Sequence, residues 1–325
     1  MRLVYFRKSV PNFGDDLNAL LWPALMPRLF DDDPASAFLG IGTIIGMPVD
    51  EHARLHVFSS GAGYDGLANW AGRDVRYRCV RGPLSARLLG LEPEAALSDG
   101  AILTPLAEGF PSAAGGGGET LVIPHYETIA RPGWPEAAGL CGFGLVDPRG
   151  APGDIVARIA AARLVLTESL HGAIIADTYG VPWIAFATSK NFGPTKWVDW
   201  RQSLGEEFQF TVVPPPDARH VLDFGRAPWP IGAEVSMDAE AAMAAFRARV
   251  APAAAPGPPR GGLRQRLKSL ARASALARRL LGFSVERTAA ALTMLALTAR
   301  PSGSSAAKRA EIQQRMLERL HSVAA

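Results

Sequence analysis

His171 stands in a polar cluster between a predicted strand and a predicted helix. The run 163–166 is typical of a short buried strand, and the pattern from Ala173 to Tyr179 is helical. Glu168 and Ser169 precede the histidine and are expected to tune its tautomer and bind substrate. An imidazole exchanges protons near neutral pH, and helix N-termini attract anions. The junction therefore predicts an anion site with His171 as its catalytic proton-transfer group, although a helix cap would also explain a histidine here.

Arg81 is a second candidate for binding an anionic group. It directly follows the apolar run 77–80 and precedes Gly82-Pro83, a typical helix start. A planar guanidinium at a strand end suits bidentate binding of a carboxylate or phosphate. The alternative is a salt bridge on the protein surface.

The composition indicates a globular α/β enzyme. The 325 residues are 48% hydrophobic and 20% charged, and they include two cysteines without a disulfide or CxxC pattern. There is no signal-peptide pattern and no run long enough to span a membrane, so we expect a cytoplasmic protein. A P-loop is absent from the sequence, and we expect neither a metal site nor a cofactor.

Positive charge is concentrated near the C-terminus. The chain has 34 Lys/Arg and 31 Asp/Glu residues, and the segment from Arg260 to Ala325 contains 13 of the basic and 3 of the acidic ones, a net charge of +10. The rest of the chain contains 21 basic and 28 acidic residues, a net charge of −7. A nucleic-acid-binding protein is therefore not expected. Residues 263–281 place leucines and basic residues on separate helical faces, which predicts either contact with an anionic membrane surface or packing against the body of the protein.

Strand-like runs alternate with helical patterns up to Val213, which predicts parallel sheets. Pro111 to Gly118, with four consecutive glycines, is the best candidate linker. We expect two doubly wound, Rossmann-like α/β domains, 1–112 and 119–250, with a cleft between them. Residues 251–325 are expected to form a Pro/Ala linker and a basic helical tail. The expected strands include Leu55 to Ser59, Tyr77 to Val80, Leu164 to Thr167, Trp183 to Ala187 and Phe208 to Val213.

Five short motifs occur at predicted strand ends or helix starts. They are Asn12–Asn18, Arg81–Ser85, Ser98–Ala101, Ser169–Gly172 and Lys196–Trp200. In this order they resemble the polysaccharide pyruvyltransferases, in particular the members that decorate bacterial exopolysaccharides. Each motif alone is short, but five in order form a fairly specific set.

The resemblance covers roughly residues 1–215 and implies a two-domain fold similar to GT-B glycosyltransferases. It also implies transfer of a pyruvate ketal group from phosphoenolpyruvate, the donor substrate, to two hydroxyls of a sugar. The sugar would belong to an exopolysaccharide repeat unit or cell-surface glycan, lipid-linked or nucleotide-linked. The basic tail would then hold the enzyme at the inner membrane.

Residue by residue, the resemblance makes His171 the acid that protonates the enol carbon. Asp99 would orient a histidine or accept a sugar proton. Some relatives have an arginine where this chain has Ser169, so Lys190 or Lys196 is expected to supply the positive charge.

The remaining candidates are expected to bind substrate. Gly14 allows close backbone approach, and Asn12 or Asp15 would bind sugar hydroxyls or cap a helix. His125 is expected to face the cleft. Ser85 and Leu170 are expected to bind substrate because they belong to the Arg81–Ser85 and Ser169–Gly172 motifs. Lys196 stands beside two tryptophans that would either stack on sugars or belong to the core.

Two other functions fit parts of the sequence. One is a GT-B-type glycosyltransferase that uses a nucleotide sugar, which requires a clamp for the diphosphate. The other is a non-catalytic scaffold of a polysaccharide assembly complex, which binds partners through residues 260–325 and does not need His171.

Overall fold

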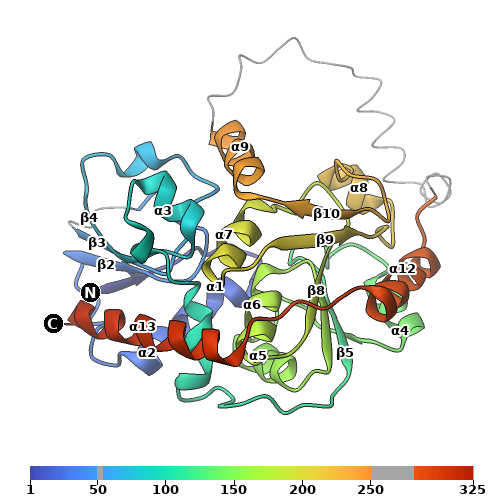
Figure 1. The fold of residues 1–325 in the computed structure, drawn as a ribbon, viewed down its shortest axis with the longest axis horizontal. Helices are drawn as coiled ribbons and strands as arrows, with labels where there is room; N and C mark the ends of the chain where they lie inside the picture. Colours follow the sequence, from blue (N-terminus) through green and yellow to red (C-terminus); the bar gives the residue numbers. More distant parts are fainter. Residues whose placement is uncertain (50–53, 251–281, 325) are drawn as a thin grey trace, which may run out of the picture.

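The computed structural model describes residues 1–49, 54–250 and 282–324, and its strands form two sheets (Figure 1). The first sheet has four strands in the order β1-β2-β3-β4, and every neighbouring pair is parallel. Its strands are β1 (Arg2–Val4), β2 (Ser36–Leu39), β3 (Arg54–Phe58) and β4 (Asp74–Cys79). The parallel α/β organisation expected from the alternating pattern is therefore present.

The second sheet has six strands in the order β10-β9-β8-β7-β5-β6. Only the pair of β10 and β9 is antiparallel. The expected strands at 164–167 and 183–187 have the observed bounds, whereas β10 was not expected. The strands are β5 (Thr120–Ile123), β6 (Gly144–Leu145), β7 (Leu164–Thr167), β8 (Trp183–Ala187), β9 (Phe208–Val212) and β10 (Glu234–Met237).

Helices connect most of the strands, and proline begins several of them. Pro83, Pro135 and Pro152 occupy first-turn positions, where the missing N–H has no helical partner to lose. The helices that precede the C-terminal segment are α1 (Phe13–Asp16), α2 (Asn18–Leu25), α3 (Pro83–Leu89), α4 (Trp134–Cys141), α5 (Pro152–Ala160), α6 (Leu170–Thr178), α7 (Thr195–Ser203), α8 (Arg219–Phe224) and α9 (Ala239–Val250), with 3-10 turns η1 (Leu67–Trp70), η2 (Pro93–Ala95) and η3 (Gly100–Leu106).

The largest hydrophobic cluster joins the two sheets. It contains Phe13 from α1, Ile174 from α6 and Met316 from the C-terminal helix, all buried. All nine residues of α6 are buried, because this helix lies between the two sheet units and contacts α1, α5 and η3. The carboxyl ends of strands from both units therefore approach each other around the start of α6.

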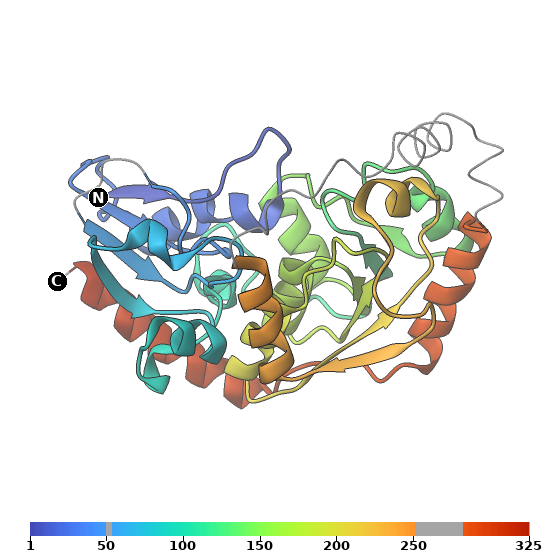
Figure 2. The same ribbon diagram turned by 90° about the horizontal axis from the view of Figure 1, so that it is seen from above.

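The C-terminal segment packs against both sheet units. Helix α12 (Val285–Thr298) contacts α4 and β7, whereas α13 (Ala306–Ala324) lies along β4 and η3 (Figures 1 and 2). Between them, Ser302 pairs with Trp183. Helices α12 and α13 thus pack on the body. The helix expected at 263–281 lies outside the described residues, so its membrane contact stays a prediction. Within the described ranges, no helix combines the length and apolarity needed to cross a bilayer.

We expect Met316→Ala to lower the free energy of unfolding by about 2–5 kcal/mol, because it leaves a cavity beneath α13. Gln314→Ala, on the exposed side of the same helix, is the control and should change stability by less than about 0.5 kcal/mol. Urea denaturation of the full chain measures both. Equal stabilities of the two variants would show that α13 does not contribute to the folded core.

Candidate active site

A pocket of about 370 Å³ lies between the two sheet units. The first unit contributes residues that follow β1 or lie in the loops after β2 and β3, and the second contributes residues that follow β5, β7 and β8. This matches the rule that ligands bind at the carboxyl ends of strands in α/β folds. The lining includes Phe6, Lys8, Asn12, Asp15, Thr43, Tyr64 and Asp65 from the first unit, and His125, Tyr126, Glu127, Ser169, Leu170, His171, Lys190, Asn191 and Lys196 from the second.

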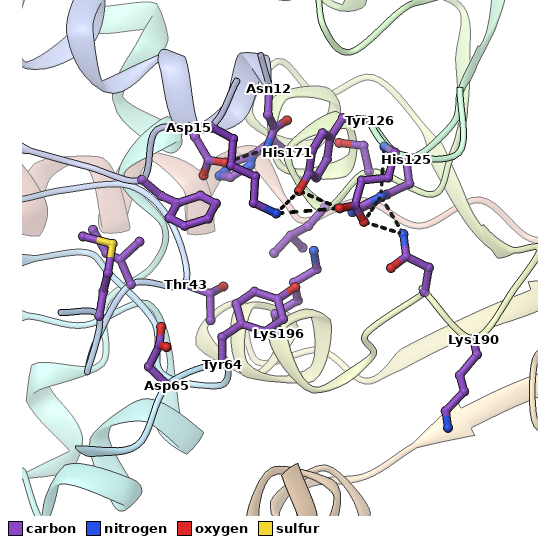
Figure 3. Close-up of a pocket in the computed structure, with 18 residues that line it drawn as sticks. Asn12, Asp15, Thr43, Tyr64, Asp65, His125, Tyr126, His171, Lys190 and Lys196 are labelled. Atoms are coloured by element: carbon purple, nitrogen blue, oxygen red, sulfur yellow. Dashed lines mark hydrogen bonds and ion pairs between the residues drawn. The ribbon is translucent and has the colours of Figure 1, made fainter. Parts of the chain in front are cut away.

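His171 is the second residue of α6 and faces this pocket (Figure 3). The helix is capped by Ser169, whose Oγ accepts a hydrogen bond from the Gly172 amide at 3.4 Å. The side chain of His171 is therefore not needed as a cap. Gly14 of α1 packs on its ring, and a Cβ at position 14 would lie only 1.9 Å from Nδ1. Glycine at position 14 is required for this close approach.

Asp99 approaches His171 from the first sheet unit. Its side chain is fully buried, and Oδ1 accepts a hydrogen bond from the Ala101 amide at 3.1 Å. Oδ2 lies 3.8 Å from Nε2 of His171. Both atoms are buried and make no hydrogen bond with the described residues. A short movement would bring them into hydrogen-bond contact.

Asn12 and Asp15 form a pair on the same side of the pocket as His171. The Asn12 Nδ2 donates to Asp15 Oδ2 at 2.7 Å, so the side chain of Asn12 does not cap α1. Burial raises the pKa of the Asp15 carboxyl, while the nearby His171, Asn12 and Lys196 act in the opposite direction. An elevated pKa suits a carboxyl that exchanges a proton near neutral pH.

Lys8 connects the first sheet unit to the loop after β5. Its Nζ donates to Tyr126 Oη at 2.9 Å and lies 3.7 Å from Glu127 Oε1. The hydrogen bond to Tyr126 is the main cause of the raised pKa of Lys8. This side of the pocket therefore carries a cation that is held at a fixed position by a phenol and a carboxylate.

His125 lies beside this group, with Nδ1 3.0 Å from Asn191 Nδ2. Its ring is mostly buried, and burial lowers the pKa of His125 well below its ordinary value, with Lys196 and Lys8 adding to the effect. Protonating His125 would place a third positive charge among these groups. The histidine predicted to face the cleft therefore does so in its neutral form.

Lys196 enters the pocket from the first turn of α7, with Nζ 5.8 Å from the centre of the Tyr64 ring. Within the described ranges it makes no salt bridge. Lys190 is exposed and extends away from the other labelled side chains (Figure 3). Trp197 and Trp200 are buried and pack on Trp183, so they belong to the core and do not stack on a ligand.

Glu168 lies behind the pocket. Its Oε1 accepts hydrogen bonds from the Thr188 amide and hydroxyl at 2.7 and 2.6 Å. Oε2 accepts from the Thr128 hydroxyl at 2.9 Å and the His125 amide at 3.3 Å. This differs from the expected role of tuning His171, because both oxygens are used to hold the ends of β5 and β8 together. Burial raises the pKa of this carboxyl.

Arg81 and Ser85 also lie outside the pocket lining. Arg81 is 1% exposed, and its Nε lies 3.1 Å from Asp199 Oδ2 in α7, while Nη1 donates to Thr43 at 2.7 Å. Ser85 donates to Asp199 through its amide at 2.9 Å and its hydroxyl at 2.6 Å. This differs from the expected substrate-facing positions, because the Asp199 carboxylate holds both residues inside the protein.

Several pocket residues were not predicted from the sequence. Lys8, Tyr126, Glu127 and Asn191 line the pocket, yet none belongs to a motif used above. Each follows a strand of a parallel sheet, so the strand-end rule that selected His171 could have selected them too. Within the described residues, no group of three or more His, Cys, Asp or Glu side chains is placed to hold a metal ion.

Two comparisons with known proteins show the family of this chain. The model of the polysaccharide pyruvyl transferase family matches residues 28–190. The succinoglycan biosynthesis protein ExoV of Rhizobium meliloti (strain 1021) is 34% identical over 221 residues, which cover 66% of this chain and 68% of that protein. The chain belongs to the polysaccharide pyruvyl transferase family. It is therefore a transferase, and the scaffold alternative is no longer needed.

The part matched by the family model contains His171, Asp99, His125 and Arg81, but not Asn12, Asp15 or Lys196. The pocket of this pyruvyl transferase is thus completed by residues on both sides of the matched range. They come from the loop after β1, helix α1, the loop after β8 and the start of α7.

In this pyruvyl transferase, Gly14→Ala should reduce turnover at least about 10-fold while the protein stays folded, because the added methyl group must displace the His171 ring. Gly139→Ala is the matched control, because a Cβ there meets nothing within 4 Å. Steady-state rates and melting temperatures of both variants are compared. Normal turnover of Gly14→Ala would show that the position of His171 is not important.

Arg81→Ala should destabilise the transferase by about 3–5 kcal/mol, because it leaves the buried Asp199 carboxylate without its cation. Arg87→Ala is the control, since it breaks an exposed ion pair with Glu240 and should cost no more than about 1 kcal/mol. Chemical denaturation gives both values. A stable Arg81→Ala variant that binds donor poorly would instead assign Arg81 to the substrate.

Proposed function

We propose that this chain transfers the carboxyethylidene group of phosphoenolpyruvate to two hydroxyls of a saccharide in an exopolysaccharide repeat unit. The observation that carries the proposal is the pocket in which His171, backed by the buried Asp99, lies near cationic side chains and a helix N-terminus. Support also comes from the family assignment and from the name of the relative, which assigns ExoV to succinoglycan biosynthesis.

The N-terminus of α6 and the lysines of the pocket supply positive potential for a dianionic donor. Helix α6 has nine residues, and Ser169 and Leu170 at its start line the pocket. The positive end of a helix and its free amides favour a phosphate or carboxylate. Lys196 lies on the same pocket and supplies the charge that some relatives place on an arginine at the position of Ser169.

The proposed reaction balances without an oxidant or a metal. A proton is added to the methylene carbon of phosphoenolpyruvate, and the first sugar oxygen bonds to the neighbouring carbon. The bond from that carbon to the phosphate oxygen then breaks, and the second sugar oxygen takes its place. Of the two hydroxyl protons, one balances the proton taken up as the methyl group forms, and the other leaves with inorganic phosphate.

His171 is suited to deliver the first proton because it faces the pocket and has Asp99 at Nε2. A hydrogen bond between Nε2 and this carboxylate, formed by a short movement, would orient the ring for the transfer. Asp15 is suited to accept a hydroxyl proton, since its raised pKa brings it closer to neutrality. Asn12 holds the Asp15 carboxyl at 2.7 Å.

We also infer a GT-B-like arrangement, in which the two parallel-sheet units are two domains that share the pocket. This inference is supported by the pocket lining, which comes from both units, and by the glycine-rich stretch 111–118 between them. The acceptor would lie over the loops of the first unit, where Phe6 and Tyr64 provide apolar surface.

The direct test of the donor is a thermal shift of the full chain with phosphoenolpyruvate, or with UDP-, GDP- or CMP-linked sugars. A ligand that binds only the folded state raises the melting temperature. We expect a shift with phosphoenolpyruvate and none with the nucleotides. A shift confined to a nucleotide sugar would favour a glycosyltransferase instead.

His171→Asn should lower the rate of phosphate release from phosphoenolpyruvate and acceptor by about 10²–10⁴-fold, because the proton donor is lost. The melting temperature should change little, since His171 lies at the pocket edge of α6. His321→Asn, on the exposed surface of α13, is the matched control. Unchanged turnover of His171→Asn would remove His171 from the proposed mechanism.

A further inference from the structure

Five side chains on one side of the pocket form a continuous hydrogen-bond chain (Figure 3). Lys8 Nζ contacts Tyr126 Oη at 2.9 Å, and Tyr126 Oη contacts Glu127 Oε1 at 3.2 Å. Asn191 Nδ2 lies 3.0 Å from Glu127 Oε2 and also 3.0 Å from His125 Nδ1. The chain begins in the first sheet unit and ends at a histidine of the second.

The direction of every bond in this chain follows from its two charged members. A lysine ammonium can only donate, and an ionised carboxylate can only accept. The Tyr126 hydroxyl therefore accepts from Lys8 and donates to Glu127. Asn191 must present its NH₂ group to Glu127, because the amide oxygen in that place would face a carboxylate oxygen at 3.0 Å.

The orientation of Asn191 determines where His125 carries its proton. The same NH₂ group faces His125 Nδ1, so Nδ1 accepts a hydrogen bond and has no proton. The backbone amide of Glu127 also points to Nδ1, at 3.4 Å, and a backbone amide can only donate. The proton of the neutral ring is therefore on Nε2, which makes no hydrogen bond with the described residues.

Lys8 and Lys196 line the same pocket as the His125 ring. Lys8 and Lys196 both disfavour its protonation. Glu127 Oε2 lies 3.8 Å from Nδ1, and the Asn191 NH₂ group bonds to both of these atoms. Two cations and an N–H group that line one pocket attract an oxygen that carries negative charge.

We infer that His125 is a fixed, neutral hydrogen-bond donor whose Nε2–H binds a phosphate or carboxylate oxygen of the substrate, and that Asn191 is the positioning residue that maintains this tautomer. His125 thus differs from His171, because it binds and orients and does not transfer protons. The identity of the substrate rests on the function proposed above, whereas the tautomer is a property of the free protein.

The tautomer is measured by long-range ¹H–¹⁵N correlation spectra of the labelled full chain without substrate, near neutral pH. The chain has six histidines, and His125→Gln identifies the signals of His125 by their loss. We expect an Nδ1 resonance typical of an unprotonated ring nitrogen and an Nε2 resonance typical of N–H. A proton on Nδ1, or a doubly protonated ring, would overturn the inference.

Asn191→Asp tests the positioning role. It replaces the donor at Nδ1 with an acceptor, so the proton should move to Nδ1 or the ring should become an imidazolium. Gln209→Glu introduces the same amide-to-carboxylate change at an exposed position of β9 and should leave the His125 signals unchanged. An Asn191→Asp spectrum identical to that of the parent protein would show that Asn191 does not set the tautomer.

The turnover of two His125 variants distinguishes hydrogen-bond donation by His125 from proton transfer by His125. His125→Gln keeps an N–H donor and should retain at least about a tenth of kcat/KM, while His125→Phe should lose about 10- to 100-fold. Equal, severe losses in both variants would contradict the donor role.

The full chain is titrated separately with phosphoenolpyruvate, inorganic phosphate and pyruvate, and the shift of the His125 Nε2 signal is measured. The ligands that shift this signal show whether a phosphate or a carboxylate oxygen binds to Nε2. If none of the three moves that signal, the binding role is wrong. If only inorganic phosphate does, the inference stands while the proposed donor fails.

Discussion

The buried ion pair between Arg81 and Asp199 is the interaction on which the geometry of the pocket depends. Both side chains are about 1% exposed, and such a pair is maintained only when further hydrogen bonds compensate for lost hydration. Ser85 and Thr43 supply these bonds. Gly82 permits the approach, because a Cβ there would lie 1.8 Å from the Asp199 carbonyl oxygen. Since Asp199 and Lys196 share α7, joining α7 to the first sheet unit also fixes where Lys196 enters the pocket.

Short sequence patterns were sufficient to predict much of the fold and part of the candidate site. The apolar runs before His171 and around Trp183 gave strands with the observed bounds, because buried parallel strands are nearly continuous hydrophobic segments. Strand β10 was missed, since its alternating burial and edge position give a weak signal over four residues. Arg81 was placed correctly at a strand end, but its partner lies 118 residues away in the sequence. No local pattern predicts such a pairing, so the direction of the guanidinium was beyond sequence reasoning.

The two histidines of the pocket show how one residue type acquires different chemistry from its neighbours. His171 has a buried carboxylate 3.8 Å from Nε2, which is placed to orient the ring. His125 has an amide donor at Nδ1 and two lysines nearby, which favour the neutral ring. The contrast follows the general rule that different environments assign different roles to similar titratable groups. The sequence analysis also gave the two residues different roles, proton transfer for His171 and substrate binding for His125, but it could not assign their hydrogen-bond partners.

The resemblance places an arginine of some relatives at the position of Ser169, and this has a consequence for how the proposed anionic donor would be held. An arginine binds a carboxylate or phosphate through a planar fork, which gives both charge and direction. The lysines of this pocket supply charge as compact ammonium groups on flexible stems, so they attract an anion without fixing its orientation. Direction must then come from rigid donors. The amides at the start of α6 and Nε2 of His125 meet this need, because the first are fixed by the helix and the second by Asn191 and Glu127. In this pocket, lysines provide the positive charge and rigid N–H donors provide the orientation of the anion. Together these groups can take the place of an arginine, and no cation is needed at position 169.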